Sequence, residues 1–500
     1  ARLNYDITFC KHHTLNAMFA FSEEYWHTRS TGASRNDRIH PSTSEINSAL
    51  TNVQSNSGSS ASEGLRSYIG RMNYSAYDKY LLEFSFRVDG SSKFIKGHQY
   101  GFFPTVAVGW RFTEEEFLKK YLSSWLSSGK LRASWGKLGD NSGVGRFEQL
   151  ETLTAMNYMS SDVVKGFVNK KMINKDLSWE VSTDINVGLD LGFLNNRLRT
   201  EIDFYNRLRT GMNRPSQMSI HLTGAYSAPR ANIGDLLNRG LELNLTWKDK
   251  IGNVEYSVNL NGAYNRTVLK EWNEFLSRGW VYLDMPYHFL YVYENNGIAQ
   301  TWQDIYNNTP QGLSPGDVIR KDLNGDGIID GKDKKAYPNI QRDRPTTTYG
   351  ITLQAAWKGF DISMLFNGGL GRKDFWLTDF NNTAFADRRY ASTWDHWTEP
   401  WSLENRGGEW PRLGTSTDRS DNSYWLYNMN YLRMKNIMLG YNLPKKLLSK
   451  ISMTNLRIYA SAENLFTVTQ YPGLDPEKKN SARDLYPINR SFSIGLNVSF

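Results

Sequence analysis

The chain has 500 residues, a formal net charge of +8 and one cysteine, Cys10, so an internal disulfide is excluded. Its mean hydropathy is −0.57 and no run of eighteen apolar residues occurs, which excludes a transmembrane helix. The basic residues are spread along the chain without a basic face or an RNA-binding motif, so nucleic acid is not an expected partner. A membrane β-barrel stays compatible with these values, because a barrel strand shows only every second side chain to lipid.

Alternation of apolar and polar residues predicts about fifteen β-strands, and the first run begins at chain position 1. In chain order the predicted strands are 1–10, 13–27, 65–77, 80–90, 100–112, 129–138, 179–193, 197–209, 238–249, 253–268, 346–358, 360–372, 429–443, 454–468 and 490–500. In these strands the face opposite the apolar side chains is unusually polar. Long strands of this kind suit a wall with lipid on one side and water on the other. Aromatic residues form 14% of the chain, a share that soluble β-proteins can reach and that interfacial girdles of Trp and Tyr would account for directly.

Two strands define the face that we expect to meet lipid. Their apolar positions are Leu241, Leu243, Leu245 and Trp247 in the first, and Phe492, Ile494, Leu496, Val498 and Phe500 in the second. The residues between them are small or polar, so the opposite face is predicted to meet water.

The connections between the predicted strands alternate between short and long. We expect six long extracellular loops, at about 28–64, 139–178, 210–237, 269–345, 373–428 and 469–489. The turns between them are short and are assigned to the periplasmic side, with one modest loop, 91–99, on the long side. The segment 113–128 interrupts the short side, and Thr113 and Glu116 have the spacing of a capping box that would begin a short helix there. Large loops at one end and tight turns at the other are typical of an outer-membrane barrel.

The predicted fold is therefore all-β, a transmembrane antiparallel β-barrel that occupies residues 1–500 as one unit. Fifteen strands is an odd number, whereas single-chain bacterial barrels usually have an even one. Together with the start inside a strand, this leads us to expect the C-terminal portion of a larger barrel.

One loop has the spacing of an EF-hand-type calcium loop, from Asp322 to Asp333. Gly327 lies at position 6, where such a loop turns sharply. The candidate ligands are the side chains of Asp322, Asn324, Asp326, Asp330 and Asp333, together with the carbonyl group of Ile328. No amphipathic helices flank the loop, so we expect a structural Ca²⁺ that stiffens the loop. The alternative is an Asx-rich turn without a metal.

The loop 373–428 is rich in tryptophan, and aromatic rings on loops can stack on sugars. The candidate substrate-binding residues are Trp376, Trp394, Trp397, Trp401 and Trp410. The alternative is a loop that packs its own aromatic side chains or contacts a partner protein. Catalytic motifs such as GxSxG, HExxH, a Walker loop or CxxC are absent from the sequence, so an enzyme is not expected.

Several long segments resemble the SusC/RagA-type TonB-dependent outer-membrane transporters of Bacteroidetes. They include LRSYIGRMNYSAYDKYLLEFSFRVDGSSKF (65–94), LRASWGKLGDNS (131–142), GDVIRKDLNGDGIIDGKDK (316–334), YLRMKNIMLGYNLPKKLL (431–448) and NLRIYASAENLFTVTQYPGLDPE (455–477). The resemblance extends over nearly the whole chain.

This resemblance implies a barrel of about 22 strands whose plug domain lies outside this chain. It also implies a SusD-like surface lipoprotein as a lid, the TonB–ExbB–ExbD complex as the energy source, and outer-membrane lipid around the wall. The implied cargo is a glycan, with an oligopeptide as the alternative in the RagA-like branch. Two other functions stay open, a passive porin-like channel and a soluble glycan-binding protein or propeller, although the sorted loop lengths disfavour a soluble protein.

Overall fold

The computed structural model describes residues 1–50, 54–122, 124–159, 163–169, 171–223, 228–274, 282–287, 289–342, 344–375, 399–412, 422–448, 453–478 and 487–499. A single sheet of fifteen strands dominates it. Its strands are β1 (Arg2–Phe9), β2 (His13–Arg35), β3 (Gln54–Ala76), β4 (Tyr80–Ser91), β5 (Tyr100–Trp110), β6 (Leu126–Asp140), β9 (Glu180–Phe193), β10 (Leu198–Thr210), β13 (Asp235–Ile251), β14 (Val254–Glu271), β19 (Thr347–Trp357), β20 (Phe360–Leu370), β23 (Tyr431–Asn442), β24 (Asn455–Thr469) and β25 (Ser491–Ser499). Each strand pairs antiparallel with the sheet strand that precedes it and the one that follows it along the chain. The predicted all-β architecture of fifteen strands is confirmed.

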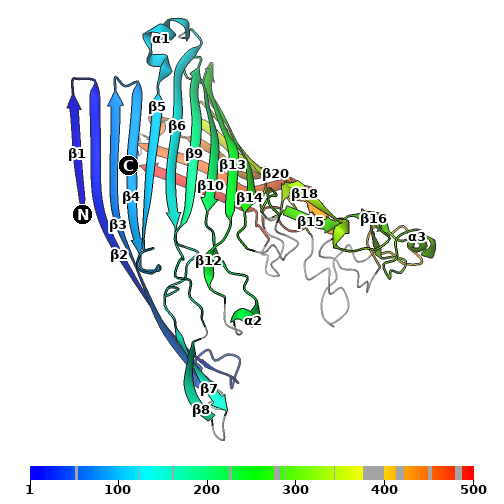
Figure 1. The fold of residues 1–500 in the computed structure, drawn as a ribbon. Helices are drawn as coiled ribbons and strands as arrows, with labels where there is room; N and C mark the ends of the chain where they lie inside the picture. The colour runs from blue at the N-terminus through cyan, green and yellow to red at the C-terminus, as the bar shows by residue number, and fades with distance from the viewer. Residues whose placement is uncertain are drawn as a thin grey trace.

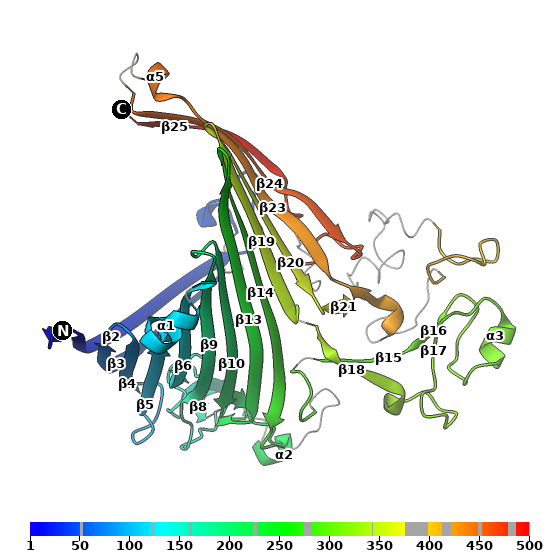
Figure 2. The same cartoon turned by 90° about the horizontal axis from the view of Figure 1, so that it is seen from above.

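The sheet is strongly curved, and β1 and β25 form its two edges (Figure 2). The strands of its middle are long, with 17 residues in β13 and 18 in β14. A tilted strand needs only about 9–11 residues to cross a bilayer, so these strands are long enough to cross it and continue beyond.

Tight turns join the strands at one end of the sheet. Cys10 and Lys11 have φ values of 51° and 58°, and Tyr77 and Asp78 both have 54°. Two consecutive left-handed residues are the mark of a turn whose twist matches that of the flanking strands. The helix α1 (Glu116–Leu122) lies at the same end (Figure 1), and the helix α5 (Lys445–Leu448) lies in the short connection between β23 and β24 (Figure 2).

The long connections gather at the opposite end (Figure 1). They contain short elements: β7 (Leu153–Met159), β8 (Val163–Asn169), β11 (Asn213–Pro215), α2 (Ile220–Thr223), β12 (Arg230–Asn232), β15 (Phe289–Tyr293), β16 (Asn295–Ile298), α3 (Trp302–Tyr306), β17 (Val318–Arg320), β18 (Lys334–Gln341), β21 (Lys373–Phe375) and β22 (Leu426–Asn428). The two ends of the sheet therefore differ as the loop lengths predict. Within the described residues, no helix is long and apolar enough to cross a membrane, a finding that leaves β-strands out of account.

Strands β2 and β3 are longer than the sequence pattern predicts. The loop expected at 28–64 is shorter, because residues 28–35 and 54–64 continue the hairpin as a paired ribbon. The side chains in this part are mostly serine, glycine and alanine, which carry no alternating pattern. Backbone pairing does not need one, and hydroxyl contacts such as Ser30 with Ser59 at 2.8 Å cross the ribbon.

The capping box predicted at Thr113 is wrong. A 3-10 turn precedes α1, and the Thr113 hydroxyl group bonds to the backbone of Gly129, accepting from its N–H at 2.9 Å. The neighbouring Glu115 is a missed anchor. Its carboxylate accepts hydrogen bonds from Tyr80 Oη at 2.6 Å and Trp110 Nε1 at 3.2 Å, which ties the helical segment to two strands.

Within the described residues, the buried apolar clusters lie among the long connections. The largest contains Leu290, Val292, Phe375 and Trp425, and a second contains Phe94, Val144 and Leu177. The apolar face of the sheet is different, because Leu241 and Leu243 keep 48% and 37% of their surface exposed. A soluble sandwich would bury this face against a second layer. Exposed apolar side chains along a long sheet are what a lipid-facing wall requires.

The predicted lipid-facing residues share one face of each strand. Leu245 and Trp247 are half-buried beside Leu241 and Leu243, and the alternating residues of β25 from Phe492 to Val498 are exposed. Phe500 lies outside the described residues. Among the described residues of this set, none lies in a buried cluster, and their contact with lipid stays a prediction.

Candidate functional site: the polar face and its loop rim

The polar face of the sheet carries arginine–carboxylate pairs that bridge neighbouring strands. Arg132 on β6 donates to Asp190 on β9 at 2.7 Å and to Asp203 on β10 at 2.9 Å. Gly188 lies beneath this group, and a Cβ atom there would come within 2.6 Å of the guanidinium carbon of Arg132. The absence of a side chain at Gly188 therefore lets the ion pairs lie flat against the wall.

The same arrangement recurs six strands further round the sheet, from β9 to β23. Arg457 on β24 donates to Asp361 on β20 at 2.5 Å, and the pair lies over Gly440. A Cβ atom at Gly440 would lie 2.6 Å from both partners. Paired charges of this kind are stable where water reaches them, which supports a hydrated interior along the polar face.

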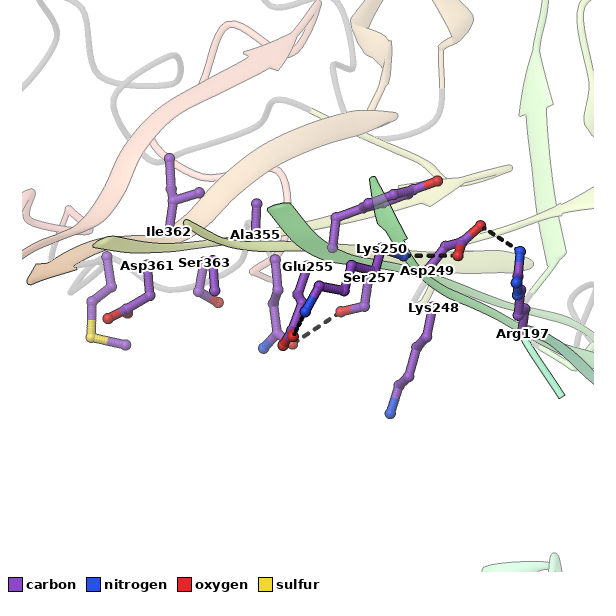
Figure 3. A pocket seen from close by; sticks show the side chains of 14 residues that line it. Arg197, Lys248, Asp249, Lys250, Glu255, Ser257, Ala355, Asp361, Ile362 and Ser363 are labelled. Carbon is purple, nitrogen blue, oxygen red and sulfur yellow. Dashed lines mark hydrogen bonds and ion pairs between the residues drawn. The ribbon is translucent and has the colours of Figure 1, made fainter. Parts of the chain in front are cut away.

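A pocket of about 840 Å³ lies on the sheet next to the tight turns (Figure 3). Lys248, Asp361 and Ser363 point to one side of the sheet, whereas Ala355 and Ile362 point to the other (Figure 3). Two ion pairs lie among its lining residues, Arg197 with Asp249 at 3.3 Å and Lys250 with Glu255 at 3.0 Å. The pocket is a polar hollow without an arranged nucleophile and base, so it has no evident catalytic chemistry.

The calcium-type loop is held by its own side chains. Asp322 accepts hydrogen bonds from the N–H groups of Gly325 at 2.6 Å and Gly327 at 2.9 Å. Although burial acts to raise it, these N–H groups hold the pKa of Asp322 below its ordinary value. Asp322 is therefore ionised at neutral pH, as a calcium ligand must be.

The last position of this loop is fully buried. Asp333 accepts from the N–H of Leu323 at 2.9 Å and from that of Asp330 at 2.8 Å, so it closes the loop onto its start. Asn324 and Asp326 are bonded within the loop as well, and the Ile328 side chain is exposed. In the part of the chain that the structure describes, no three His, Cys, Asp or Glu side chains are grouped to hold a metal ion. The donor set has the right residue types for Ca²⁺, and its occupation stays a prediction.

Of the candidate sugar-binding tryptophans, Trp376, Trp394 and Trp397 lie outside the described residues. Trp401 is only 6% exposed, and its Nε1 donates to Gln300 at 3.0 Å. The ring of Trp410 lies 6.1 Å from that of Trp425, which belongs to a buried cluster. Trp401 therefore offers little ring surface to a sugar, whereas Trp410 is half-buried, and sugar binding by these residues stays a prediction.

Two buried arginines of the loop rim were missed from the sequence. Arg433 on β23 pairs with Asp475 at 2.7 Å and with Glu477 at 2.6 Å. Arg372 donates to the carbonyl groups of Pro476 at 3.1 Å and Lys478 at 3.1 Å. Both arginines fasten the segment 475–478 to the rim. Nothing in the local sequence around either arginine predicts its contact with the segment 475–478, because these partners lie 42 to 106 residues away.

Known proteins share this architecture. Residues 2–311 match the family model described as TonB dependent receptor-like, beta-barrel. The chain belongs to this family of outer-membrane β-barrel receptors. Within the family it is of the SusC/RagA type, as the resemblance in the sequence predicts.

Two relatives show this relationship. TonB-dependent receptor P3 of Formosa agariphila is 30% identical over 476 residues, which cover 87% of this chain and 45% of the relative. TonB-dependent receptor SusC of Bacteroides thetaiotaomicron is 30% identical over 456 residues, which cover 87% of this chain and 44% of the relative. The chain thus spans about half the length of the curated relatives it matches.

Among solved structures, the fold is similar to that of the RagAB peptide transporter. The TM-score is 0.82 at 24% sequence identity, over 100% of this chain and 55% of that one. The likeness establishes the fold of the sheet and of its loop rim.

Proposed function

We propose that this chain forms wall and extracellular loops of an active importer that takes up oligosaccharides across the outer membrane. The observation that carries the proposal is the division of the sheet into two faces. One face exposes apolar side chains such as Leu241 and Leu243, and the other carries water-compatible ion pairs such as Arg132 with Asp190. Such a wall separates lipid from a hydrated path, and the family supplies the expectation that transport is energised through TonB.

A SusD-like lipoprotein is the proposed partner at the loop end. The long connections fold into small substructures there, with buried clusters of their own and clamps such as Arg372 on the segment 475–478. Ordered loops can present a fixed surface to a lid, whereas loose loops would lose more conformational entropy on binding. The TonB–ExbB–ExbD complex is the proposed energy source, acting through parts of the protein beyond this chain.

An oligopeptide is the second candidate cargo, and the likeness in fold to the RagAB peptide transporter favours it. A passive porin-like channel is a third candidate, since an active importer and a passive channel both need a hydrated wall. The polar hollow beside the tight turns gives no positive support for an enzymatic role, since Arg197 and Lys250 in it are tied up in ion pairs with Asp249 and Glu255.

Uptake in cells tests the proposal. The host strain lacking the gene, and the strain complemented with the intact gene, are supplied with labelled oligosaccharides or oligopeptides. We expect complementation to restore oligosaccharide uptake, and an uncoupler of the proton gradient or loss of TonB to abolish it. Uptake that persists without the gradient would indicate a passive channel, and restored peptide uptake alone would overturn the choice of glycan.

A further inference from the structure

A second pocket, of about 390 Å³, lies where the polar face meets the long loops. Four arginines line it: Arg207, Arg209, Arg214 and Arg344. The first two project from β10, Arg214 is on β11, and Arg344 follows β18. The size is that of a small ligand site, and guanidinium groups are the side chains best suited to a carboxylate.

The strand register places this pocket on the water side of the wall. Arg207 lies opposite Asn238 of β13, which in turn lies opposite Thr267 of β14. Asn238 shares its face of β13 with Asn244, six residues along, and not with Leu241 or Leu243. A solute in a hydrated interior would therefore meet the pocket, whereas lipid would not.

The charges around the pocket are only partly cancelled. Arg207 is paired with Asp184 at 2.6 Å, and Arg209 is paired with Glu180 and with Asp140. Among the described residues, Arg214 and Arg344 take part in no ion pair, and Arg214 donates instead to the neutral hydroxyl group of Tyr287 at 3.2 Å. Two guanidinium groups thus keep their positive charge available to an anion.

Two buried amides of the pocket also lack a partner within the described residues. Gln341 is only 5% exposed and its Nε2 is unbonded, and the Oδ1 atom of Asn238 is buried and unbonded as well. Buried polar groups are nearly always satisfied, so an unpaired donor beside an unpaired acceptor points to a missing polar ligand. A sugar hydroxyl group can both donate and accept, and can therefore satisfy either amide.

We infer that this arginine pocket binds a uronate residue of an acidic oligosaccharide. The sugar carboxylate pairs with Arg214 and Arg344, and ring hydroxyl groups bond to Asn238 and Gln341. The inference rests on the proposed import of glycans and narrows their class to carboxylated ones. Arg207 and Arg209 remain paired with the carboxylates of β6 and β9 described above, and they line the pocket without binding the ligand.

Calorimetry on the intact protein in detergent tests the inference, with trigalacturonate as the probe. Its methyl ester keeps the hydroxyl groups and loses the charge, and a tripeptide with a free C-terminus offers the same carboxylate on another backbone. The test variant is the double substitution Arg214→Gln and Arg344→Gln. The control is Arg239→Gln, an arginine on the opposite face of β13 that bonds to Asn206 at 2.7 Å.

We expect trigalacturonate to bind the native protein and the Arg239→Gln control equally. Esterification and the double substitution should each weaken binding by about tenfold or more, since charge-assisted hydrogen bonds are lost. Equal binding of the ester, full affinity in the double variant, or binding of the tripeptide alone would overturn the inference. If the binding test fails but neutral oligosaccharides are still imported in a TonB-dependent way, the proposed function holds and only the choice of acidic sugars is wrong. If no glycan of any kind is imported, the proposed function is wrong as well.

Discussion

Arg433 and Asp475 form an ion pair at 2.7 Å although 42 residues separate them, and their side chains are only 3% and 2% exposed. The pair joins β23 to the loop segment after β24. A buried pair of this kind costs desolvation to form, so its value to stability shows chiefly when one partner is removed.

Replacing Arg433 by methionine should free the segment 475–478 from the rim. The Asp475 carboxylate would be left buried without its counter-charge, at a cost of about 3–5 kcal/mol. Limited proteolysis of the intact protein, with mapping of new cuts near residue 478, measures the release. Arg71→Met is the matched control, because the pair of Arg71 with Glu83 is exposed. Such exposed pairs contribute about 0–1 kcal/mol. Equal protease resistance in both variants would show that the buried pair does not fasten the loop.

Arginine on the apolar face of β14 should impair insertion into the membrane. Leu260→Arg places a charge among side chains that we assign to lipid, at a cost of about 2–4 kcal/mol near the bilayer midplane. The neighbouring Asn261→Arg faces the water side and should be tolerated. Asn259 is a poorer control, since its amide donates to Asn244 at 2.7 Å and Thr246 at 2.8 Å. Heat-modifiable migration of the folded barrel on gels measures both variants, and identical yields would show that the faces are misassigned.

The attachment of α1 to the sheet should weaken in acid. The hydrogen bond from Tyr80, followed by that from Trp110, holds the pKa of Glu115 below its ordinary value. A carboxyl group with a lowered folded-state pKa contributes stability above the unfolded pKa of about 4.3 and loses it as the pH falls through the folded value.

A spin label at Lys120→Cys, with Cys10 replaced by serine, reports the mobility of α1. We expect a constant, restricted signal from pH 7 down to about pH 5 and rising mobility below about pH 4. Glu115→Gln should remove most of this pH dependence. Glu114→Gln should retain it, because the Glu114 carboxylate pairs with the exposed Lys119 at 3.7 Å. A native pH profile in the Glu115→Gln variant would contradict the assignment.

The loop from Asp322 to Asp333 should bind Ca²⁺ in calorimetry. Asp326 is an exposed member of the loop, so Asp326→Ala should reduce calcium binding while the bonds of Asp333 keep the loop folded. The exposed Glu404→Ala serves as the control for general loss of negative charge. If the native protein and Asp326→Ala give the same heats, the loop is an Asx-rich turn held by its own side chains.

Much of the sheet could be predicted, because the alternation of a strand and the conformation of a tight turn depend on residues adjacent in the sequence. Alternation from Leu241 to Trp247 and left-handed turn residues such as Asp78 are encoded by neighbours in the chain. The ribbon formed by residues 28–35 and 54–64 was not predicted, because its small residues pair through the backbone and show no alternating side-chain pattern.

Contacts between distant parts of the chain, at both ends of the sheet, were much harder to predict. At the tight-turn end, Glu115 accepts hydrogen bonds from residues up to 36 positions away. The pocket around Arg214 and Arg344 likewise depends on which loops meet at the rim, and no short sequence pattern encodes such a meeting.

The two-faced wall is tested most directly by spin labels on adjacent residues of β13. Single cysteines at Leu243 and Glu242, with Cys10 replaced by serine, are labelled in the intact protein reconstituted into bilayers. Collision with oxygen, which concentrates in lipid, is compared with collision with a water-soluble nickel complex. We predict that the label at 243 favours oxygen and the label at 242 favours nickel. Equal accessibility at both positions, or the reverse order, would contradict a wall between lipid and water.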